Sequence, residues 1–425
     1  MWPVTATSGR LVSRSLSWQP GRFSAAVLLV SALVALWLVS PVFWDRLGGD
    51  SRAFYSAARV DQRGGDPYSF SQLKAEEAAV DANSGRHPGT TAYGANPYHY
   101  PPLMTVAWEA LTPLGDRGFY WANLGVLLLL GVAGFEMVLA ALSWTRRGLP
   151  RALFLVSPAT AVVLVSGNPS TVLLAAWGGA LLAASRRRAL LAGALLAIGW
   201  IKPPVGLPAA AALLLAGPGS KRSMLAGFGL GTLGFGVANI AVGGGDQTLR
   251  WARSLFEFTA TLDPRQAEVI GQCCLTGLPG LMLGAVPMPV AVAAAGLLAL
   301  AMLWVAARRG LLGDSSPDPL WTLAILVALA LVVTPYVHLN DLVLESLPVL
   351  LIASQPLTAI SRLTLLLWGL GVVTPVVLSL FPVVASAGLP SSVAPFGLLL
   401  ALLTAVSLTA GRQPAGSPAA VPAAA

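Results

Sequence analysis

Charged residues are scarce in this sequence of 425 residues: only 10% are Asp, Glu, Lys or Arg, whereas 56% are hydrophobic. A soluble protein of this length needs far more polar side chains to cover its surface. Long apolar runs instead recur from end to end and are separated by short basic clusters. The composition therefore predicts a polytopic membrane protein.

Other missing features exclude further classes of protein. The two cysteines, Cys273 and Cys274, are adjacent and cannot build a disulfide framework. The sequence has no phosphate-binding loop of the G-x-x-x-x-G-K type and no pair of histidines with the close spacing of a metal site. We therefore expect neither a bound nucleotide, nor a metal, nor another cofactor.

The charged residues that give the net charge of +8 are divided unevenly between the two expected sides of the membrane. When the N-terminus is placed in the cytoplasm, the cytoplasmic segments hold fifteen cations against two acids, and the long outer segments 44–118 and 244–280 hold ten cations against thirteen acids. This is the bias of the positive-inside rule, and it does not point to nucleic acid. We expect a multi-pass plasma-membrane protein with both termini in the cytoplasm.

Apolar runs between helix breakers predict about twelve transmembrane helices in an all-α fold. The first follows three arginines and is longer than the apolar part of a signal peptide, so we expect it to be retained. The expected spans cover roughly residues 24–43, 119–143, 152–166, 171–185, 189–201, 204–217, 223–243, 285–307, 320–337, 341–355, 363–382 and 392–411.

This threading divides the chain into a cytoplasmic N-terminus (1–23), a transmembrane domain (24–411) and a disordered cytoplasmic tail (412–425) rich in Ala and Pro. It also leaves four ionisable residues inside or at the edge of spans, where each costs about 2.5–3.5 kcal/mol near a helix centre. Such residues usually face a polar cavity or a partner. They are Glu136, for which an arginine is a possible structural partner, Lys202, Asp341 and Glu345.

The stretch GGDSRAFYSAARVDQRGGDPY, residues 48–68, concentrates charge directly after the first expected span. Its helical spacing places Arg52, Tyr55 and Arg59 on one face and small or aromatic residues on the other. This pattern predicts an amphipathic helix at the outer membrane surface, on which Arg52 is solvated. Asp50, just before this helix, suits an N-cap as well as a catalytic carboxylate.

The stretch NPYHYPPLMTVAWEALTPLG, residues 96–115, predicts a helix that starts at Pro101-Pro102 and is too short to cross the bilayer. Its apolar faces favour insertion into the outer leaflet. The first outer segment is therefore expected to be structured and anchored to lipid, as a site at the boundary of water and bilayer would be.

Several motifs in this order resemble glycosyltransferase family 87. They are DSRAFYSAAR, GGDPY, YHYPPLM and the PLG stop of the first outer segment, then SGNPS with the following helix pair up to IKPP, and finally TPYVHLND. The sequence departs from the family pattern at Gly167-Asn168-Pro169, where Gly-Gln is usual, around Gln272, and at Tyr336-Val337 before His338.

The resemblance implies a GT-C type fold and a polyprenyl-phosphate-mannose-dependent α-1,2-mannosyltransferase, of the kind that assembles actinobacterial phosphatidylinositol mannosides. The enzyme would move a sugar from a polyprenyl-phosphate donor to a glycolipid or cell-envelope glycan acceptor, in contact with membrane lipids, on the outer face. It implies an inverting mechanism in which Asp50 is the catalytic base. The residues expected to bind substrate are Tyr55, Arg59, Tyr100, Lys202 and His338.

Alternatives remain open at this point. Lys202 could snorkel to the interface, and His338 could be a polar helix cap. Arg250 and Arg253 are further candidates for the donor phosphate, or are interfacial anchors. A transporter or flippase of lipid-linked sugars is the rival class, although transporters usually carry polar residues at the midplane. Another polyprenyl-phosphate sugar, such as arabinofuranose, is the rival donor.

Overall fold

The computed structural model describes residues 49–84, 98–144, 166–216 and 218–260, together with scattered positions within 150–163 and 297–359. Every secondary-structure element within these residues is a helix. The elements are α2 (Gly49–Gln62), α3 (Phe70–Ser84), α4 (Pro102–Glu109), η2 (Thr112–Leu114), α5 (Gly115–Ala141), α8 (Ser170–Ser185), α9 (Ala189–Leu196), η3 (Ala197–Ile201), α10 (Pro203–Ala216), α11 (Lys221–Ala260) and α16 (Ser346–Ala353).

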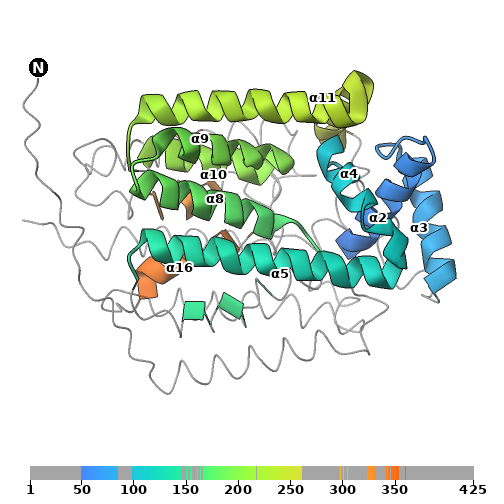
Figure 1. The fold of residues 1–425 in the computed structure, drawn as a ribbon, viewed down its shortest axis with the longest axis horizontal. Helices are drawn as coiled ribbons and strands as arrows, with labels where there is room; N and C mark the ends of the chain where they lie inside the picture. The colour runs from blue at the N-terminus through green and yellow to red at the C-terminus, as the bar shows by residue number, and fades with distance from the viewer. Residues whose placement is uncertain are drawn as a thin grey trace, which may run out of the picture.

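The long helices form a bundle in which α5 packs on α8, α8 on α9, and α9 on α11 (Figure 1). Glycines allow the closest approach: a Cβ added to Gly193 would lie 1.9 Å from the Met224 carbonyl oxygen, and one on Gly227 would lie 2.0 Å from that of Leu190. Small residues at helix crossings are typical of packing in membranes, where backbone contact replaces the hydrophobic effect.

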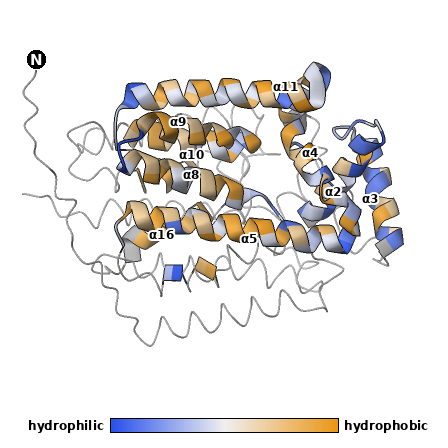
Figure 2. Cartoon of the chain, viewed as in Figure 1, coloured by the Kyte–Doolittle hydropathy of each residue, from blue (hydrophilic) through white to orange (hydrophobic). Residues whose placement is uncertain are grey.

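Two helices are long and apolar enough to cross a membrane, Thr112–Ala141 and Lys221–Leu255. Large apolar side chains project from α11 without cover, and Leu230, Leu233 and Val237 are each more than half exposed. Apolar residues line most of this helix and of α5 in Figure 2. Such a surface is unfavourable in water and is satisfied by lipid.

The helices agree with several expected spans. The ranges 119–143, 171–185, 189–201 and 204–217 correspond to α5, α8, α9 with η3, and α10. The expected range 223–243 is only the first part of α11, which continues after a sharp bend at Gly244 (φ 74°, ψ 170°). The total of twelve spans stays a prediction, because the first span and the last two lie outside the described residues.

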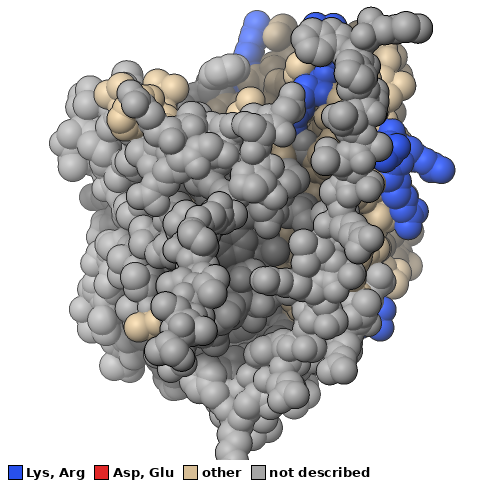
Figure 3. Space-filling model, turned by 90° about the vertical axis from the view of Figure 1, so that its left-hand side faces the viewer, with Lys and Arg blue, Asp and Glu red and all other residues tan. Residues whose placement is uncertain are grey.

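Basic side chains gather at one end of the bundle. The α8–α9 turn carries Arg186, Arg187 and Arg188, and α11 begins at Lys221 and Arg222. Figure 3 views this end, where blue side chains lie along the top and right-hand edge. On the same side, Arg151 forms a bidentate ion pair with Glu136 of α5, and the Nη2–Oε2 distance is 2.9 Å. Glu136 thus has the structural arginine partner considered from the sequence.

The segment from α2 to η2 folds as a small helical unit at the opposite end. Phe54 of α2 stacks on Trp108 of α4, with ring centroids 4.0 Å apart, and Tyr98 and Tyr100 contact both rings. Both faces of α2 are buried, since α3, α4 and α5 pack around it. The expectation of an amphipathic α2 on the membrane surface is therefore wrong.

The charged face of α2 is covered by the acidic helix α3. Arg52 is 3% exposed and lies 2.9 Å from Glu77 Oε2 and 2.8 Å from Asp81 Oδ2. The sequence pattern placed Arg52 in solvent, but a neighbouring acidic helix lets the cation be buried in ion pairs. Apolar spacing along α2 alone could not reveal this partner, which lies 25 and 29 residues further on.

The part of α11 after the bend at Gly244 contacts α2 and the residues between α2 and α4. Gln247 Nε2 donates to Asp61 Oδ1 (2.8 Å), and Arg250 lies 3.3 Å from Asp66. Trp251 Nε1 donates to the His99 carbonyl oxygen (3.1 Å). The part of α11 after the bend therefore holds the segment from α2 to α4 in place. Arg250 has a protein partner and does not serve only as an interfacial anchor.

The buried ion pairs of Arg52 generate a first prediction. Arg52→Ala leaves two buried carboxylates without their cation, and removing one partner of a buried pair costs roughly 3–5 kcal/mol. We expect a clearly lower midpoint of thermal unfolding for the full chain purified in detergent.

Arg63→Ala is the matched control, because Arg63 also pairs with α3, through Glu76, but its side chain is 58% exposed. An exposed pair contributes about 0–1 kcal/mol. Equal losses of stability in the two variants would contradict the burial argument.

Candidate active site

A tight turn before α8 contacts the start of α2. Gly167 has φ +74°, and its N–H donates to the Val163 carbonyl oxygen at 2.8 Å. A Cβ on Gly167 would lie 1.7 Å from Ser51 Oγ. Both the left-handed backbone and the contact with Ser51 require glycine here. The turn can therefore place the following residue, Asn168, beside the first turn of α2.

Asn123 of α5 holds the turn against α2 through hydrogen bonds. It is 3% exposed, and its Nδ2 donates to Ser51 Oγ (3.0 Å) and to the Gly167 carbonyl oxygen (3.1 Å). Its Oδ1 accepts from Trp108 Nε1 at 3.4 Å. One buried amide thereby joins α2, α4, α5 and the turn before α8. A hydrogen-bond hub of this kind fixes relative positions that apolar packing alone would leave adjustable.

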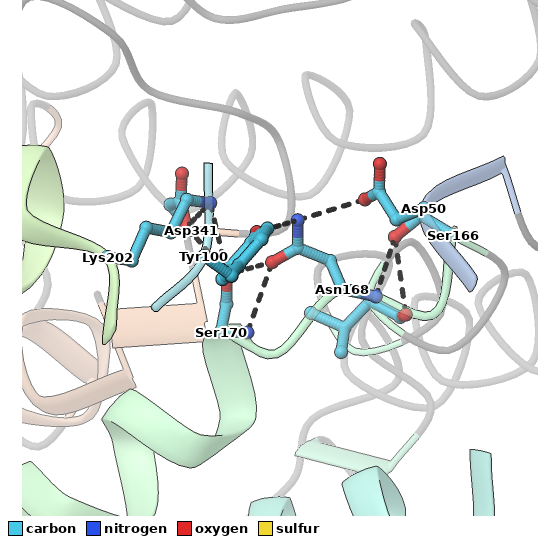
Figure 4. A network of polar contacts seen from close by, with 8 residues as sticks. Asp50, Tyr100, Ser166, Asn168, Ser170, Lys202 and Asp341 are labelled. Atoms are coloured by element: carbon cyan, nitrogen blue, oxygen red, sulfur yellow. Dashed lines mark hydrogen bonds and ion pairs between the residues drawn. The ribbon is translucent and has the colours of Figure 1, made fainter. Parts of the chain in front are cut away.

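Asp50 and Tyr100 meet at the side chain of Asn168 (Figure 4). Asn168 Nδ2 donates to Asp50 Oδ2 at 2.9 Å and lies 3.4 Å from the Tyr100 hydroxyl oxygen. Asp50 is half-buried, whereas Asn168 is 2% exposed. The carboxylate is thus oriented by a residue 118 positions away, so it is more than a local helix cap.

The network continues from Asn168 to a buried ion pair. Ser170 Oγ lies 2.6 Å from Asn168 Oδ1 and 2.6 Å from Asp341 Oδ1. Lys202 Nζ lies 2.6 Å from the same oxygen of Asp341, with the lysine 8% and the aspartate 0% exposed. A buried lysine requires an anionic partner, and here the protein itself supplies it.

The chain bends at Lys202 for local reasons. The helical path from α9 tightens into η3, and the residue before Pro203 is driven out of the helical region to φ −138°, ψ 75°. Pro203 and Pro204 then open α10, because proline is tolerated in a first helical turn. The Lys202 carbonyl oxygen accepts from Val205 and Gly206 N–H at 3.1 and 2.8 Å. Lys202 therefore lies at the joint of two helices.

The protein environment changes the pKa values of Asp50 and Tyr100. Burial raises the pKa of the Asp50 carboxyl above its usual value, and the hydrogen bond from Asn168 and the nearby Lys202 cation oppose part of that rise. Burial, reinforced by the charges of Asp50 and Asp341, also raises the pKa of the Tyr100 hydroxyl. Tyr100 thus keeps its proton, while Asp50 becomes a stronger base than an exposed aspartate.

The structure brings together three of the residues expected from the sequence: Asp50, Tyr100 and Lys202. Tyr55 and Arg59 lie further along α2 and contact other elements. The Tyr55 ring packs on Phe119 with centroids 5.3 Å apart, and Arg59 donates to Glu76 Oε1 at 2.6 Å and to Tyr55 OH at 3.3 Å. His338 lies outside the described residues.

The network contains four residues that were not in the expected set: Asn123, Asn168, Ser170 and Asp341. Asp341 had a signal in the sequence, since an aspartate and a lysine within apolar spans are each expensive and pair readily. Asn168 and Ser170 belong to the motif SGNPS, which resembles a family turn, but nothing in the sequence indicated which groups they contact. Asn123 had no signal, because asparagine is common in turns and helix ends. Contacts with residues 44 to 171 positions away identify the three, such as Asn123 with Gly167 and Ser170 with Asp341.

Within the part of the chain that the structure describes, no group of three or more His, Cys, Asp or Glu side chains lies close enough to hold a metal ion.

The contact of Gly167 with Ser51 yields a second prediction. Gly167→Ala places a Cβ in the space of Ser51 Oγ and in a left-handed conformation, which together cost roughly 2–4 kcal/mol. We expect a lower unfolding midpoint in the full chain. Gly229→Ala on the exposed face of α11, where a Cβ would meet no atom within 4 Å, should leave the midpoint unchanged or raise it slightly. If both variants unfold like the wild type, the turn tolerates a side chain and our account of it fails.

Comparison with known proteins supplies the family. No curated protein matches the sequence. The profile of glycosyltransferase family 87 matches residues 98–335, more than half of the chain, including Tyr100, Asn168 and Lys202 of the network. Family 87 is a GT-C family of membrane enzymes that use lipid-linked sugar donors. The helical bundle, the membrane-length helices and the matched segment together establish that this chain belongs to glycosyltransferase family 87.

Proposed function

We propose that the enzyme transfers mannose from a polyprenyl phosphate to a lipid-linked or cell-envelope glycan acceptor, with Asp50 as the catalytic base. The observation that carries this proposal is the Asp50 carboxylate, held by Asn168 at one end of a buried polar network. The family requires a lipid-linked donor, and polyprenyl phosphate is a good leaving group that needs no acid catalyst. Membership of a glycosyltransferase family also favours this reading over a transporter.

Asp50 would act in a single displacement with inversion. The acceptor hydroxyl oxygen attacks the anomeric carbon, its proton passes to the Asp50 carboxylate, and the bond from that carbon to the phosphate oxygen breaks. A positioned base of this kind contributes typically 10²–10⁴-fold to the rate. The raised pKa of Asp50 supports the role, because a base is most effective when its pKa approaches the working pH.

Lys202 would contact the departing phosphate from the other end of the network. An ammonium group has three donors, and among the described residues Asp341 and Ser170 accept two of them. We assign the third to a phosphate oxygen, on which negative charge grows during transfer. His338, three residues before Asp341, is proposed as a second donor to the same phosphate.

The remaining expected residues divide by their contacts. Tyr100, whose hydroxyl lies beside Asn168, is proposed to bind the sugar or the acceptor. Tyr55 and Arg59 contact Phe119 and Glu76, so we propose that they act by holding α2 in place. Their substitution should then lower stability as well as activity.

We also propose that the site faces the outside of the plasma membrane. α8 begins at Ser170, in the network, and ends at Ser185, next to three arginines. The arginine end would be cytoplasmic by the positive-inside rule. An extracellular site suits an acceptor in the cell envelope and a donor that stays in the bilayer.

The base assignment predicts that Asp50→Asn lowers transfer by about 10²–10⁴-fold. Asparagine keeps the size and can still accept from Asn168, so the fold should persist. The measurement is transfer of label from radiolabelled polyprenyl-phosphate-mannose to native lipid acceptors in membranes with equal enzyme levels. Wild-type activity should rise as the pH rises through the Asp50 pKa, because the base must be deprotonated, and this rise should begin above the pKa of an ordinary aspartate.

This assay tests the identity of the base and the identity of the sugar separately. Equal transfer by wild type and Asp50→Asn would show that the base lies elsewhere. If neither transfers mannose but wild type uses another polyprenyl-phosphate sugar, the sugar assignment fails and the base is tested with that donor.

The ion pair of Lys202 generates a further prediction. Lys202→Met alone strands a buried carboxylate and should cost roughly 3–5 kcal/mol of stability, whereas Lys202→Met with Asp341→Leu removes both charges and should restore it. If Lys202 contacts the phosphate, the double variant unfolds like wild type but transfers at least about tenfold more slowly. Full activity in the double variant would show that the pair of Lys202 and Asp341 has only a structural role.

A further inference from the structure

A cavity of about 850 Å³ lies at the basic end of the bundle, the far end of α8 from the Asp50 network. It opens between the α8–α9 turn and the α10–α11 turn. Its lining includes Arg187, Arg188, Ser220, Ser223, Leu190 and Leu191. It therefore combines cations, hydrogen-bond donors and hydrocarbon in one place, and the reaction proposed above uses none of them.

Arg187 has an unfavourable backbone for an arginine. It has φ +61°, and the turn around it satisfies the end of α8: Arg187 N–H donates to the Ala184 carbonyl oxygen (3.0 Å) and Arg188 N–H to that of Ala183 (2.8 Å). This is a Schellman ending, whose left-handed position normally holds glycine. An arginine here lowers stability, so its presence needs another reason, and Arg187 is part of the lining of the cavity.

Further donors surround the same cavity. The first turns of α9, at Ala189, and of α11, at Lys221, begin beside it, and helix N-termini favour anions. In Figure 3 the charged side chains visible at this end are blue. The cavity therefore suits a phosphate group.

The apolar walls indicate what carries the phosphate. Leu190 and Leu191 are 51% and 46% exposed, and Leu225, one turn into α11, is 56% exposed. These leucines form an apolar surface between the cavity and the exposed apolar face of α11. A soluble phosphate would gain nothing from such walls, whereas acyl chains would cover them.

We propose that this cavity binds the headgroup of an anionic membrane phospholipid. Its phosphate would contact Arg187, Arg188 and the serine hydroxyl groups, and its acyl chains would cover Leu190, Leu191 and Leu225. Basic pockets between transmembrane helices on the cytoplasmic side are suited to such headgroups. The lipid would join the α8–α9 and α10–α11 hairpins, so it should stabilise the fold. This proposal requires only that the chain lies in a membrane, and it is independent of the sugar transferred.

The test measures the lipid-dependent rise in the unfolding midpoint of the full chain in detergent. Phosphatidylglycerol is titrated against phosphatidylcholine and against inorganic phosphate, since a ligand of the folded state raises the free energy of unfolding with the logarithm of its concentration relative to its dissociation constant. Binding of radiolabelled phosphatidylglycerol to the same preparations gives the affinity directly. We expect a rise with phosphatidylglycerol that is smaller at high salt and much smaller with the two other additions.

Three variants locate the site. Arg187→Gly removes the cation and relieves the left-handed strain, so the lipid-free protein should be as stable as wild type or more so, yet bind phosphatidylglycerol about fivefold more weakly. Arg188→Gln should weaken binding by a similar factor without changing the turn conformation. Arg186→Gln is the matched control, because Arg186 belongs to the same triplet but is not part of the lining.

The results decide the proposal in either direction. An affinity for phosphatidylglycerol reduced about fivefold in Arg187→Gly and in Arg188→Gln, with Arg186→Gln like wild type, supports the site. Equal responses to phosphatidylcholine or inorganic phosphate overturn the anionic lipid as the ligand. A full response in Arg187→Gly, or an equal loss in Arg186→Gln, overturns the cavity as its location.

Discussion

The ion pair between Lys202 and Asp341 joins parts of the chain 139 residues apart in surroundings almost free of charge. Neither residue is tolerable alone in an apolar interior, so each requires the other. Ser170 and Asn168 extend the pair to Asp50, and Asn123 holds the turn that carries them. The position of the candidate base therefore depends on a chain of polar contacts that begins at a buried charge.

Helices in lipid satisfy their own backbone, so polar side chains can be concentrated where chemistry needs them. In this enzyme they are concentrated at the two ends of the bundle. One end carries the Asp50 network and the aromatic unit around Trp108, and the other carries the arginine turns and the cavity. α8 runs between these ends, from Ser170 in the network to Ser185 at the cavity, and α9 with η3 runs from Ala189 at the cavity to the joint at Lys202.

The family match and the geometry support different parts of the account. The matched segment, 98–335, includes Tyr100, Asn168 and Lys202, whereas Asp50 and Asp341 lie on either side of it. The family thus establishes a glycosyltransferase with a lipid-linked donor, and the hydrogen bonds connect the flanking carboxylates to the matched core. The assignment of roles to those carboxylates is a proposal that the variants above address.

The sequence alone determined the properties that depend on local patterns. Apolar runs and proline positions predicted α5, α8, α9 and α10 to within a few residues, and motif order pointed to family 87. It also singled out Asp50, Tyr100 and Lys202, because the resemblance to the family marked all three and Lys202 is a charge within an apolar stretch. Each of these signals is local to one stretch of sequence and needs no knowledge of the fold.

Only the tertiary structure decided which distant groups meet. Arg52 is buried, although its helical spacing suggested solvent, because α3 supplies two carboxylates. Lys202 pairs with Asp341 because α10 and α16, which follow these two residues, belong to one core. Asn123, Asn168 and Ser170 became visible as partners only through contacts over long separations in sequence. Hydrophobic periodicity indicates which residues face away from water. It carries no information about the polar group that a buried residue will contact.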